Sequence, residues 1–391
     1  MRHYLDHAST SWPKPPGVIE AGVSFQASCG AAAGRGGYRS SQEADRVVQS
    51  TRRLLQETIG AAHSDEIAFC TNGTHSLNAA IFGLALGSMG KPFHVVTTAT
   101  EHNSVLRPLA LAAKRGWLTW TAVECDPTGR VDPADVADAV RPETRWLFIN
   151  HASNVTGYIQ DIAAIREIAD RHSIHLMIDA AQSLGYLPID VRDSGIDILS
   201  APGHKGLSGT LGTGLLYVRR EIQSSLAPLL IGGTGELSET IDGDFSWQSV
   251  IESGNLNVPA IASLKCAMEW KQSSPGTDYS LWIQQLLDAI NASSKFEVVG
   301  SQRRSLHSHV PIISVVARSR NSGLLSQELA MMMESMANVE CRAGFHCAGL
   351  IHQSLNTTDC GGTLRLSMGQ TSQADDVVAA CEGIQRMAEI L

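Results

Sequence analysis

Hydrophobic and polar residues follow two alternating patterns along the first two thirds of the chain. Short runs rich in β-branched and apolar residues predict strands, and longer stretches with apolar residues at helical spacing predict helices. The predicted strands are 66–70, 94–98, 119–123, 146–150, 175–179 and 196–200, and the predicted helices are 41–59, 77–86, 104–115, 132–140 and 162–172. This alternation predicts an α/β fold with a mostly parallel sheet flanked by helices, in which ligands bind on loops at the carboxyl ends of the strands.

The pattern changes after a glycine-rich stretch at 232–254. Helical patterns follow at 258–272, 279–292 and 326–336, together with one apolar strand at 310–317, a loop-like stretch at 341–362 and a last helix from Gln373. We therefore expect a large domain at 15–257 and a smaller α+β domain at 258–391, with residues 1–14 packing nearby. A chain of 391 residues is long enough for such a division.

Composition narrows the range of partners. The formal net charge of -9 does not suit a nucleic-acid-binding protein, which is usually basic. The longest apolar stretch, 79–89, is too short to cross a bilayer, and the first residues do not resemble a secretory signal. We therefore expect a cytoplasmic protein that binds neither nucleic acid nor a membrane. The eight cysteines are scattered along the chain, which favours reduced thiols.

Lys205 follows a predicted buried strand and lies between glycines in Gly203-His204-Lys205-Gly206. Burial disfavours the charged form of a lysine, and a neutral amine is the form that bonds to a carbonyl group. A surface lysine in a turn explains this segment equally well.

Asp179 ends the predicted strand at 175–179, and Gln182 follows it. A carboxylate in this position can keep a pyridine nitrogen protonated. An aspartate that caps the next helix is the commoner explanation of the pattern.

Small polar residues fill the segment from Cys70 to Ser76, between a predicted strand and a predicted helix. The N-terminus of such a helix can hold a phosphate through main-chain N–H groups and hydroxyls, and ordinary helix capping is the alternative. His102 ends the following strand. Its ring can stack on a planar ligand or belong to an ordinary loop histidine.

Two cysteines and two histidines occur in the loop-like stretch, namely Cys341, His346, Cys347 and His352. Their spacing differs from the usual pairing of zinc ligands, so we expect no metal there. A single nucleophilic thiol in a glycine-containing loop is the better interpretation of Cys347. An inert buried cysteine is the alternative.

In their order along the chain, these segments resemble the cysteine desulfurase family. These are class V aminotransferase-like enzymes of the pyridoxal 5'-phosphate (PLP) fold type I. The resemblance extends from Tyr4 to the C-terminus, includes the segments at 4–10 and 34–40, and is closest to the branch with a short catalytic loop, which contains selenocysteine lyase-like members. It implies a large PLP-binding domain and a small C-terminal domain that carries the catalytic cysteine.

The resemblance implies a set of cofactor-binding residues. Lys205 corresponds to the lysine that PLP binds covalently, Asp179 to the residue that contacts the pyridine nitrogen, and His102 to the histidine that stacks on the ring. Gln182 corresponds to the residue that contacts the phenolic oxygen. The other implied cofactor-binding residues are Gly73, Thr74, His75, Asn154, His204 and Thr234. Thr234 lies in a segment that the partner subunit contributes in the family, which implies a homodimer.

The resemblance also implies the chemistry. The segment at 342–348 is similar to the family's Arg-x-Gly-x-His-Cys-Ala, in which the cysteine takes up sulfur. Arg365, together with Asn154, corresponds to the residues that hold the substrate carboxylate. The implied reaction converts L-cysteine to L-alanine with sulfur transfer to Cys347 as a persulfide. Lys205, Cys347 and His102 are the implied catalytic residues, and the sulfur acceptor is an unidentified protein or small molecule.

Other functions fit parts of the same pattern. A selenocysteine lyase, or another class V lyase or epimerase, uses the same cofactor residues. A PLP-binding scaffold or sulfur carrier without turnover is a second alternative, and a PLP-dependent transcriptional regulator would need a DNA-binding domain for which this chain has no room. The chain departs from the family pattern at His7, His75, Pro202 and Asn255, and none of these changes removes an essential catalytic group.

Overall fold

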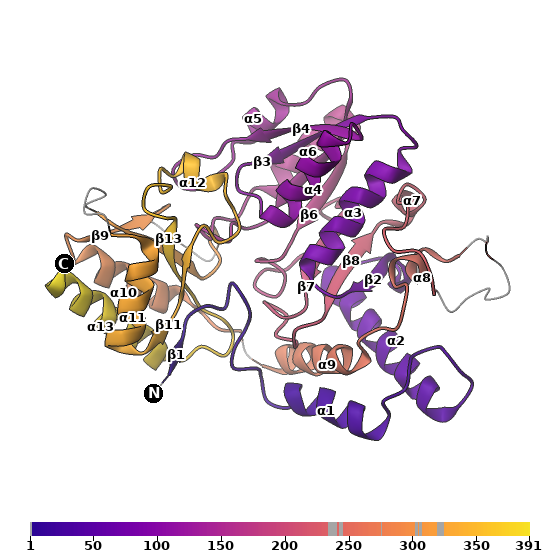
Figure 1. Ribbon diagram of the computed structural model, residues 1–391, viewed down its shortest axis with the longest axis horizontal. Coiled ribbons are helices and arrows are strands. Elements are labelled where there is room, and N and C mark those ends of the chain that lie inside the picture. Colours follow the sequence, from indigo (N-terminus) through magenta and orange to yellow (C-terminus); the bar gives the residue numbers. More distant parts are fainter. Residues whose placement is uncertain are drawn as a thin grey trace.

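Two sheets organise the chain, as seen in the computed structural model (Figure 1). The structure describes residues 2–233, 241, 245–274, 276–301, 304, 307–318 and 324–391. A seven-stranded sheet occupies the larger part of the molecule, and a four-stranded sheet the smaller part. No helix in these ranges combines the length and the apolar character needed to cross a membrane.

The seven-stranded sheet has the strand order β2-β8-β7-β6-β5-β3-β4. Its strands are β2 (Ile67–Cys70), β3 (Phe93–Thr98), β4 (Leu118–Val123), β5 (Thr144–Asn150), β6 (His175–Asp179), β7 (Ile198–Pro202) and β8 (Gly214–Val218). The five strands from β7 to β4 are parallel, whereas β8 is antiparallel to both β7 and β2. The predicted mostly parallel sheet is thus confirmed. β8, a fully buried run of five residues, was not predicted from the sequence.

Helices cover both faces of this sheet, and side chains of β5 show which helix covers which face. Leu147 and Ile149 pack in one hydrophobic cluster with α2 (Arg39–Ile59) and α6 (Ile162–His172). Trp146 and Phe148 point the other way, into a cluster formed with α3 (Gly73–Gly87) and α4 (Asn103–Lys114). The short helices of this part are η1 (Ser64–Glu66), α5 (Pro133–Asp138), α7 (Arg220–Gln223) and α8 (Trp247–Ile251).

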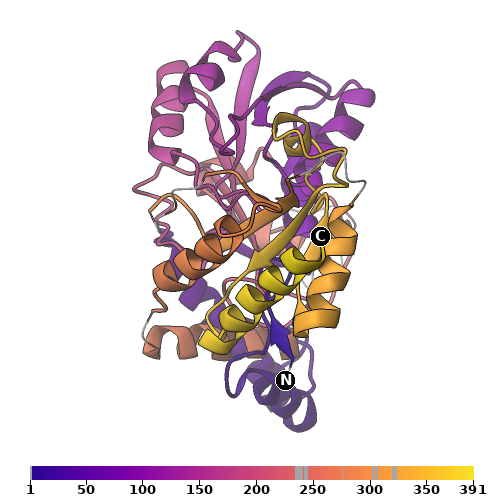
Figure 2. The ribbon, with the colours of Figure 1, turned by 90° about the vertical axis from the view of Figure 1, so that its left-hand side faces the viewer.

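The small domain is built on an antiparallel sheet with the order β12-β13-β10-β9. Its elements are β9 (Phe296–Val299), β10 (Ile312–Ala317), β12 (Arg342–Gly344), β13 (Thr363–Ser367), α10 (Ser280–Asn291), α11 (Ser326–Ala337), α12 (Ile351–Ser354) and α13 (Ala374–Ile390). α10, α11 and α13 lie along it (Figure 2). The N-terminal strand β1 (His3–Tyr4) pairs in parallel with β11 (Val339–Glu340). The stretch predicted as a loop, 341–362, therefore contains the strand β12 and the helical turn α12.

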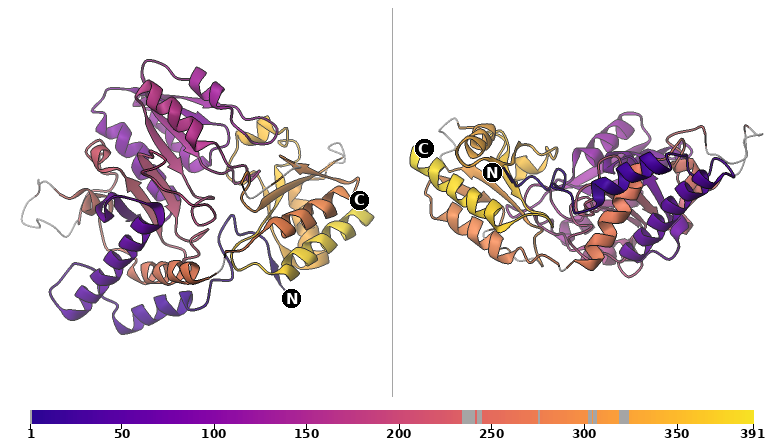
Figure 3. Two further views of the ribbon diagram at one scale, coloured as in Figure 1. Left: turned by 180° about the vertical axis from the view of Figure 1, so that it is seen from behind. Right: turned by 90° about the horizontal axis from the view of Figure 1, so that it is seen from below.

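The helix α9 (Val258–Ser273) belongs to the large domain by its packing. It lies beside α1 (Val18–Ser28) and α2 (Figure 3). Val258, Ile261 and Leu264 join the hydrophobic cluster of the seven-stranded sheet. We therefore propose a domain boundary after α9, and not after residue 257 as the sequence predicts. A helical pattern shows that one face is buried but not which sheet covers it.

Candidate active site

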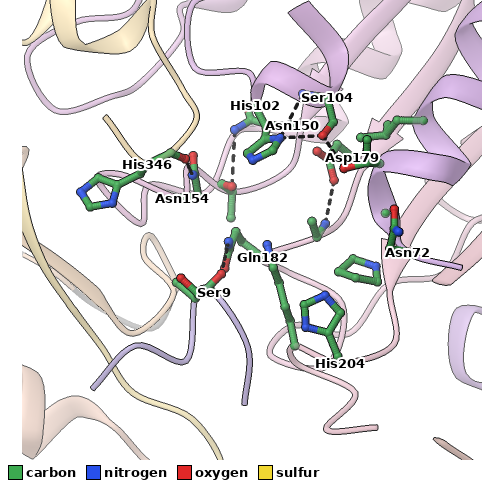
Figure 4. A pocket seen from close by; sticks show the side chains of 18 of the residues that line it. Ser9, Asn72, His102, Ser104, Asn150, Asn154, Asp179, Gln182, His204 and His346 are labelled. Atoms are coloured by element: carbon green, nitrogen blue, oxygen red, sulfur yellow. Dashed lines mark hydrogen bonds between the residues drawn. The ribbon is translucent and has the colours of Figure 1, made fainter. Parts of the chain in front are cut away.

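A cavity of about 210 Å³ lies at the carboxyl ends of the parallel strands, where the small domain meets the large one (Figure 4). It brings together nine of the predicted site residues, which come from both domains: Gly73, Thr74, His102, Asn154, Asp179, Gln182, His204, Lys205 and Arg365. Two predicted residues, His75 and Cys347, do not line it. Thr234 lies outside the described residues.

The turn that carries Lys205 begins at the end of β7 and is held by the N-terminal segment. The carbonyl of His204 accepts hydrogen bonds from Ser11 N (3.0 Å), Ser11 Oγ (3.0 Å), Thr10 Oγ1 (3.2 Å) and Lys14 Nζ (3.2 Å). Within the turn, Ser208 N donates to the carbonyl of Lys205 at 2.8 Å. Several donors on one carbonyl fix the main chain immediately before the lysine.

The other side of the turn is held by residues of α9 and of the small domain. Gln370 Nε2 donates to the carbonyls of Gly185 (3.0 Å) and Gly206 (3.4 Å), and Lys271 Nζ also donates to the carbonyl of Gly185. Gly185 has a φ of +96°, and a Cβ there would lie 2.2 Å from the carbonyl oxygen of Gly206. Only glycine allows this close approach of two main-chain segments.

Lys205 and Asp179 are an oppositely charged pair in this cavity. The pKa of Lys205 is lowered to about 8, mainly by burial, with Asp179 opposing the shift and the charges of Arg365 and Arg342 adding to it. Burial raises the pKa of Asp179, whereas the N–H of Ala181, at 2.9 Å from Oδ1, and the charge of Lys205 lower it. The site therefore contains an amine that loses its proton near neutral pH and a carboxylate that is fixed in position.

The N-termini of α3 and α4 meet at one end of the cavity. Thr74 Oγ1 and Ser104 Oγ lie 2.8 Å apart, and Ser104 N donates to His102 Nδ1 at 3.0 Å. Burial lowers the pKa of His102 to about 4, so its ring is neutral at physiological pH. The His75 ring points away from the cavity, since its Nδ1 accepts from Thr71 N at 3.2 Å.

Arg365 anchors the side of the cavity formed by the small domain. Its side chain is 1% exposed. Nη2 donates to Asp6 Oδ1 (2.7 Å) and Ser9 Oγ (2.9 Å), and Nη1 donates to the carbonyl of Asn154 (3.0 Å). Asn154 Nδ2 in turn donates to the carbonyl of His346 (2.6 Å). Asp6 thus orients the guanidinium on which the substrate carboxylate is expected to bind.

Cys347 lies in an exposed loop between β12 and α12. Its carbonyl accepts from Asn103 N at 2.6 Å, and its Sγ is 3.6 Å from Arg342 Nη2. The adjacent His346 is buried with its Nε2 close to the carbonyl and hydroxyl of Thr363, so its ring does not serve the thiol. Within the described residues, all eight cysteines are free, and no group of three or more potential ligands could hold a metal ion.

Several polar cavity residues were not among the predicted site residues, and Asn72, Ser104 and Asn150 are three of them. Asn72 caps α3 by accepting from His75 N at 2.9 Å, and Ser104 follows the His102 cap of α4. Asn150 ends β5 opposite Asp179 of β6. A polar residue that ends a buried strand was the signal that identified Asp179, and the same signal would have identified Asn150.

Comparison with known proteins agrees with this geometry. The sequence profile described as "Aminotransferase class-V" matches residues 3–379. The chain is 30% identical to a "Probable cysteine desulfurase" of Methanothermobacter thermautotrophicus, with 98% of this chain and 94% of that protein covered. The chain belongs to the cysteine desulfurase family.

Two solved structures extend this similarity. The "Apo structure of Cysteine Desulfurase from Thermococcus onnurineus NA1" has a TM-score of 0.86 and 26% identity, and the match covers 100% of this chain and 95% of that chain. The structure named "SspA in complex with cysteine" has a TM-score of 0.78 and 25% identity, with 95% and 100% covered. Like other cysteine desulfurases, the chain uses PLP as its cofactor.

The residues of the cavity fit PLP. Lys205 supplies the amine, Asp179 the carboxylate, and the N-terminus of α3 at Gly73 and Thr74 the main-chain N–H groups for a phosphate. Asn154 Oδ1 is buried and has no hydrogen-bond partner among the described residues. An unpaired buried polar atom costs about 1–3 kcal/mol, and a polar ligand in the cavity would remove that cost.

Proposed function

We propose that this chain is a PLP-dependent cysteine desulfurase that converts L-cysteine to L-alanine and transfers the sulfur to Cys347 as a persulfide. The observation that carries the proposal is one cavity that joins Lys205 and Asp179 of the large domain to Arg365 of the small domain, with Cys347 at its side. This arrangement provides a cofactor-binding amine, a carboxylate anchor and a thiol within one site. Membership of the cysteine desulfurase family supports the same reaction.

The cavity residues have separate roles toward cofactor and substrate. PLP, when bound, withdraws electrons from the bonds at the substrate Cα. With PLP in the cavity, Asp179 would hold a proton at the pyridine nitrogen, Gln182 would contact the phenolic oxygen, and His102 would cover the ring. Gly73 and Thr74 would bind the phosphate. Arg365 pairs with the substrate carboxylate and thereby orients the Cα–H bond.

Proton transfer at Cα is assigned to Lys205. Its pKa of about 8 leaves an appreciable share of neutral amine near neutral pH, so Nζ can accept the Cα proton. The hydrogen bonds on the carbonyls of His204 and Gly206 hold the turn that carries it. Misplacement of a catalytic base by about 1 Å costs orders of magnitude in rate, which explains the number of bonds that fix this turn.

Sulfur transfer is assigned to Cys347. Its thiolate attacks the substrate sulfur, the new S–S bond forms, and the Cβ–S bond breaks with its electron pair left on carbon. Cβ then takes up a proton and becomes the methyl group of alanine. One thiol and one cysteine thus give one persulfide and one alanine, without an external oxidant. Arg342 Nη2 lies 3.6 Å from the Cys347 Sγ.

We extend the proposal to a cytoplasmic homodimer. The segment at 232–235 resembles one that the partner subunit contributes to the phosphate site in the family. In the described part of this segment, the carbonyl of Gly233 accepts from Arg35 Nη2 at 2.7 Å, and Ile231 is 90% exposed. Leu230, 49% exposed, adjoins Ile231, and exposed apolar residues that lie together mark interaction surfaces more often than single ones do.

The test is to measure alanine and sulfide formed from L-cysteine by the purified holoenzyme in the presence of dithiothreitol. We expect equal amounts of the two products, and a Cys347 peptide that is heavier by one sulfur atom when the enzyme is quenched by alkylation during turnover. L-Selenocysteine serves as a parallel substrate. Turnover of selenocysteine alone, with no alanine from cysteine, would replace the proposal by a selenocysteine lyase.

A further inference from the structure

A second cavity of about 410 Å³ adjoins the cofactor cavity on the side of Cys347. It lies between α3 and α4, and three of its lining residues, Thr74, His102 and Ser104, also line the cofactor cavity. Among the residues that the structure describes, Cys347 is the only one of the small domain that lines this cavity. The thiol therefore lines the second cavity beside the cofactor cavity, and a molecule in the second cavity can reach it without entering the cofactor cavity.

The position of Cys347 in this wall is set by its main chain. The carbonyl of Cys347 accepts from Asn103 N, at the start of α4, at 2.6 Å. His346 and Cys347 both have left-handed backbone conformations, with φ of 48° and 57°. Such a conformation costs energy for residues other than glycine, so the shape of the loop is imposed by these contacts. The loop holds an exposed thiol against α4.

The walls of the second cavity are apolar on one side. Phe82 of α3 and Pro108 and Leu111 of α4 line it, and Leu111 is 47% exposed. The Phe82 ring is fixed by an edge-on contact with Trp117, with ring centroids 6.3 Å apart. A fixed aromatic ring and an exposed leucine form a surface that binds a short apolar stem.

A free cation lies on the same wall. Arg107 lines the cavity, and its side chain is exposed and has no hydrogen-bond or ion-pair partner within the described ranges. Its charge acts on the active site, because it is one of the causes that lower the pKa of His102. Phe82, Arg107 and Cys347 thus place an apolar surface, a positive charge and a thiol around one space.

We infer that this second cavity binds the sulfur acceptor, and that the acceptor is a small organic thiol with an anionic group on a short apolar stem. Its thiol would meet Cys347, its stem would pack between Phe82 and Leu111, and its anion would pair with Arg107. The inference rests on the proposed function, because it assigns the acceptor of the persulfide formed there.

The transfer step balances without any other reactant. The acceptor thiolate attacks the outer sulfur of the Cys347 persulfide, a new S–S bond forms on the acceptor, and the bond between Cys347 Sγ and the outer sulfur breaks. Cys347 leaves as a thiolate, and the acceptor leaves as its own persulfide.

The first test compares two thiols of the same length, 3-mercaptopropionate and 3-mercapto-1-propanol, as acceptors for the holoenzyme with L-cysteine. We expect the wild type to favour the anionic thiol in kcat/KM by about two- to fivefold, which is the effect of one partly exposed charge pair. Arg107→Gln should abolish this preference, and Arg107→Lys should restore part of it. Arg115→Gln, an exposed arginine that follows the same helix and lies outside the cavity, should leave the ratio as in the wild type.

The second test does not depend on turnover. The enzyme without cysteine is alkylated by iodoacetate or by iodoacetamide, and the rate of modification of Cys347 is followed by mass spectrometry. The ratio of the modification rate with iodoacetate to the modification rate with iodoacetamide should fall by about two- to fivefold in Arg107→Gln. A fall in this ratio with no alanine from cysteine would refute the desulfurase function but retain an anion-selective cavity at Cys347. Unchanged ratios for Arg107→Gln in both tests overturn the inference.

Discussion

The loops that carry Lys205 and Cys347 differ in how firmly the protein holds them. The carbonyl of His204, next to Lys205, accepts three side-chain hydrogen bonds and one main-chain bond from the N-terminal segment, and Gln370 reaches the carbonyl of Gly206 on the other side. Cys347 lies in an exposed loop, and the bond from Asn103 N to its carbonyl is its main-chain tie to the large domain.

This difference corresponds to two kinds of chemistry. A base that removes a proton from a bound substrate must keep one position, so the turn around Lys205 is fixed from both domains. A thiol that receives sulfur and then delivers it must be accessible, and Cys347 is exposed in the wall of the second cavity, next to the cofactor cavity. We expect substitutions at the two loops to have separable effects on cofactor binding and on sulfur transfer.

The largest effect is expected for Lys205→Ala. Loss of the amine removes both the covalent link to PLP and the base at Cα, so kcat should fall by roughly 1,000-fold or more. The visible absorbance of the bound cofactor should also be lost. Lys265→Ala, which removes a partly exposed lysine of α9 paired with Glu269, serves as the control. A Lys205→Ala enzyme with wild-type absorbance and turnover would exclude this assignment.

Cys347→Ser should separate the two loops. The cofactor absorbance should remain as in the wild type, while formation of alanine and sulfide from cysteine should fall by roughly two orders of magnitude or more. A serine hydroxyl does not replace a thiolate as a nucleophile toward sulfur. Cys381→Ser, on α13 and away from both cavities, is the matched control. Alanine production at the wild-type rate would remove Cys347 from the mechanism.

Asp6→Asn should affect the substrate side of the cavity. Asp6 Oδ1 orients the Arg365 guanidinium at 2.7 Å, and loss of one charged hydrogen bond is worth about tenfold in affinity. We expect KM for cysteine to rise about tenfold, with a smaller change in kcat and an unchanged cofactor spectrum. Glu340→Gln, which removes a more exposed ion pair with Arg2, is the control. A wild-type KM would show that Arg365 does not depend on Asp6.

The smallest effect is expected for Lys271→Met, which probes how the Lys205 turn is held. Burial lowers the pKa of Lys271 from 10.5 to about 8. The folded state therefore loses this proton before the unfolded state does, and the folded state becomes relatively more stable as the pH rises above 8. Between pH 7 and pH 9 the wild type should gain about 1 kcal/mol more unfolding free energy than the variant.

Urea unfolding of the two proteins at both pH values measures this difference. Lys265→Met should behave as the wild type, because Lys265 is partly exposed and pairs with Glu269. If the unfolding free energies of the wild type and of Lys271→Met depended on pH equally, burial would not lower the pKa of Lys271.

The sequence alone determined the parallel strands and the polar residues that end them. Strand and helix periods are local properties, and parallel strands bring their carboxyl ends to one edge of the sheet, so Asp179, His102 and the start of α3 were predicted to belong to one site. The family resemblance added Arg365 and gave Lys205 and Cys347 their roles, and the match to the class V aminotransferase profile covers residues 3–379.

Only the tertiary structure decided the contacts between distant segments. The bond between Arg365 and Asp6 joins residues 359 positions apart, and the packing of α9 on the large domain depends on which sheet covers its apolar face. The structure also turned the His75 ring away from the cofactor cavity and placed Cys347 beside a second one. Such contacts depend on how whole elements pack against each other, and no local pattern of residues encodes that packing.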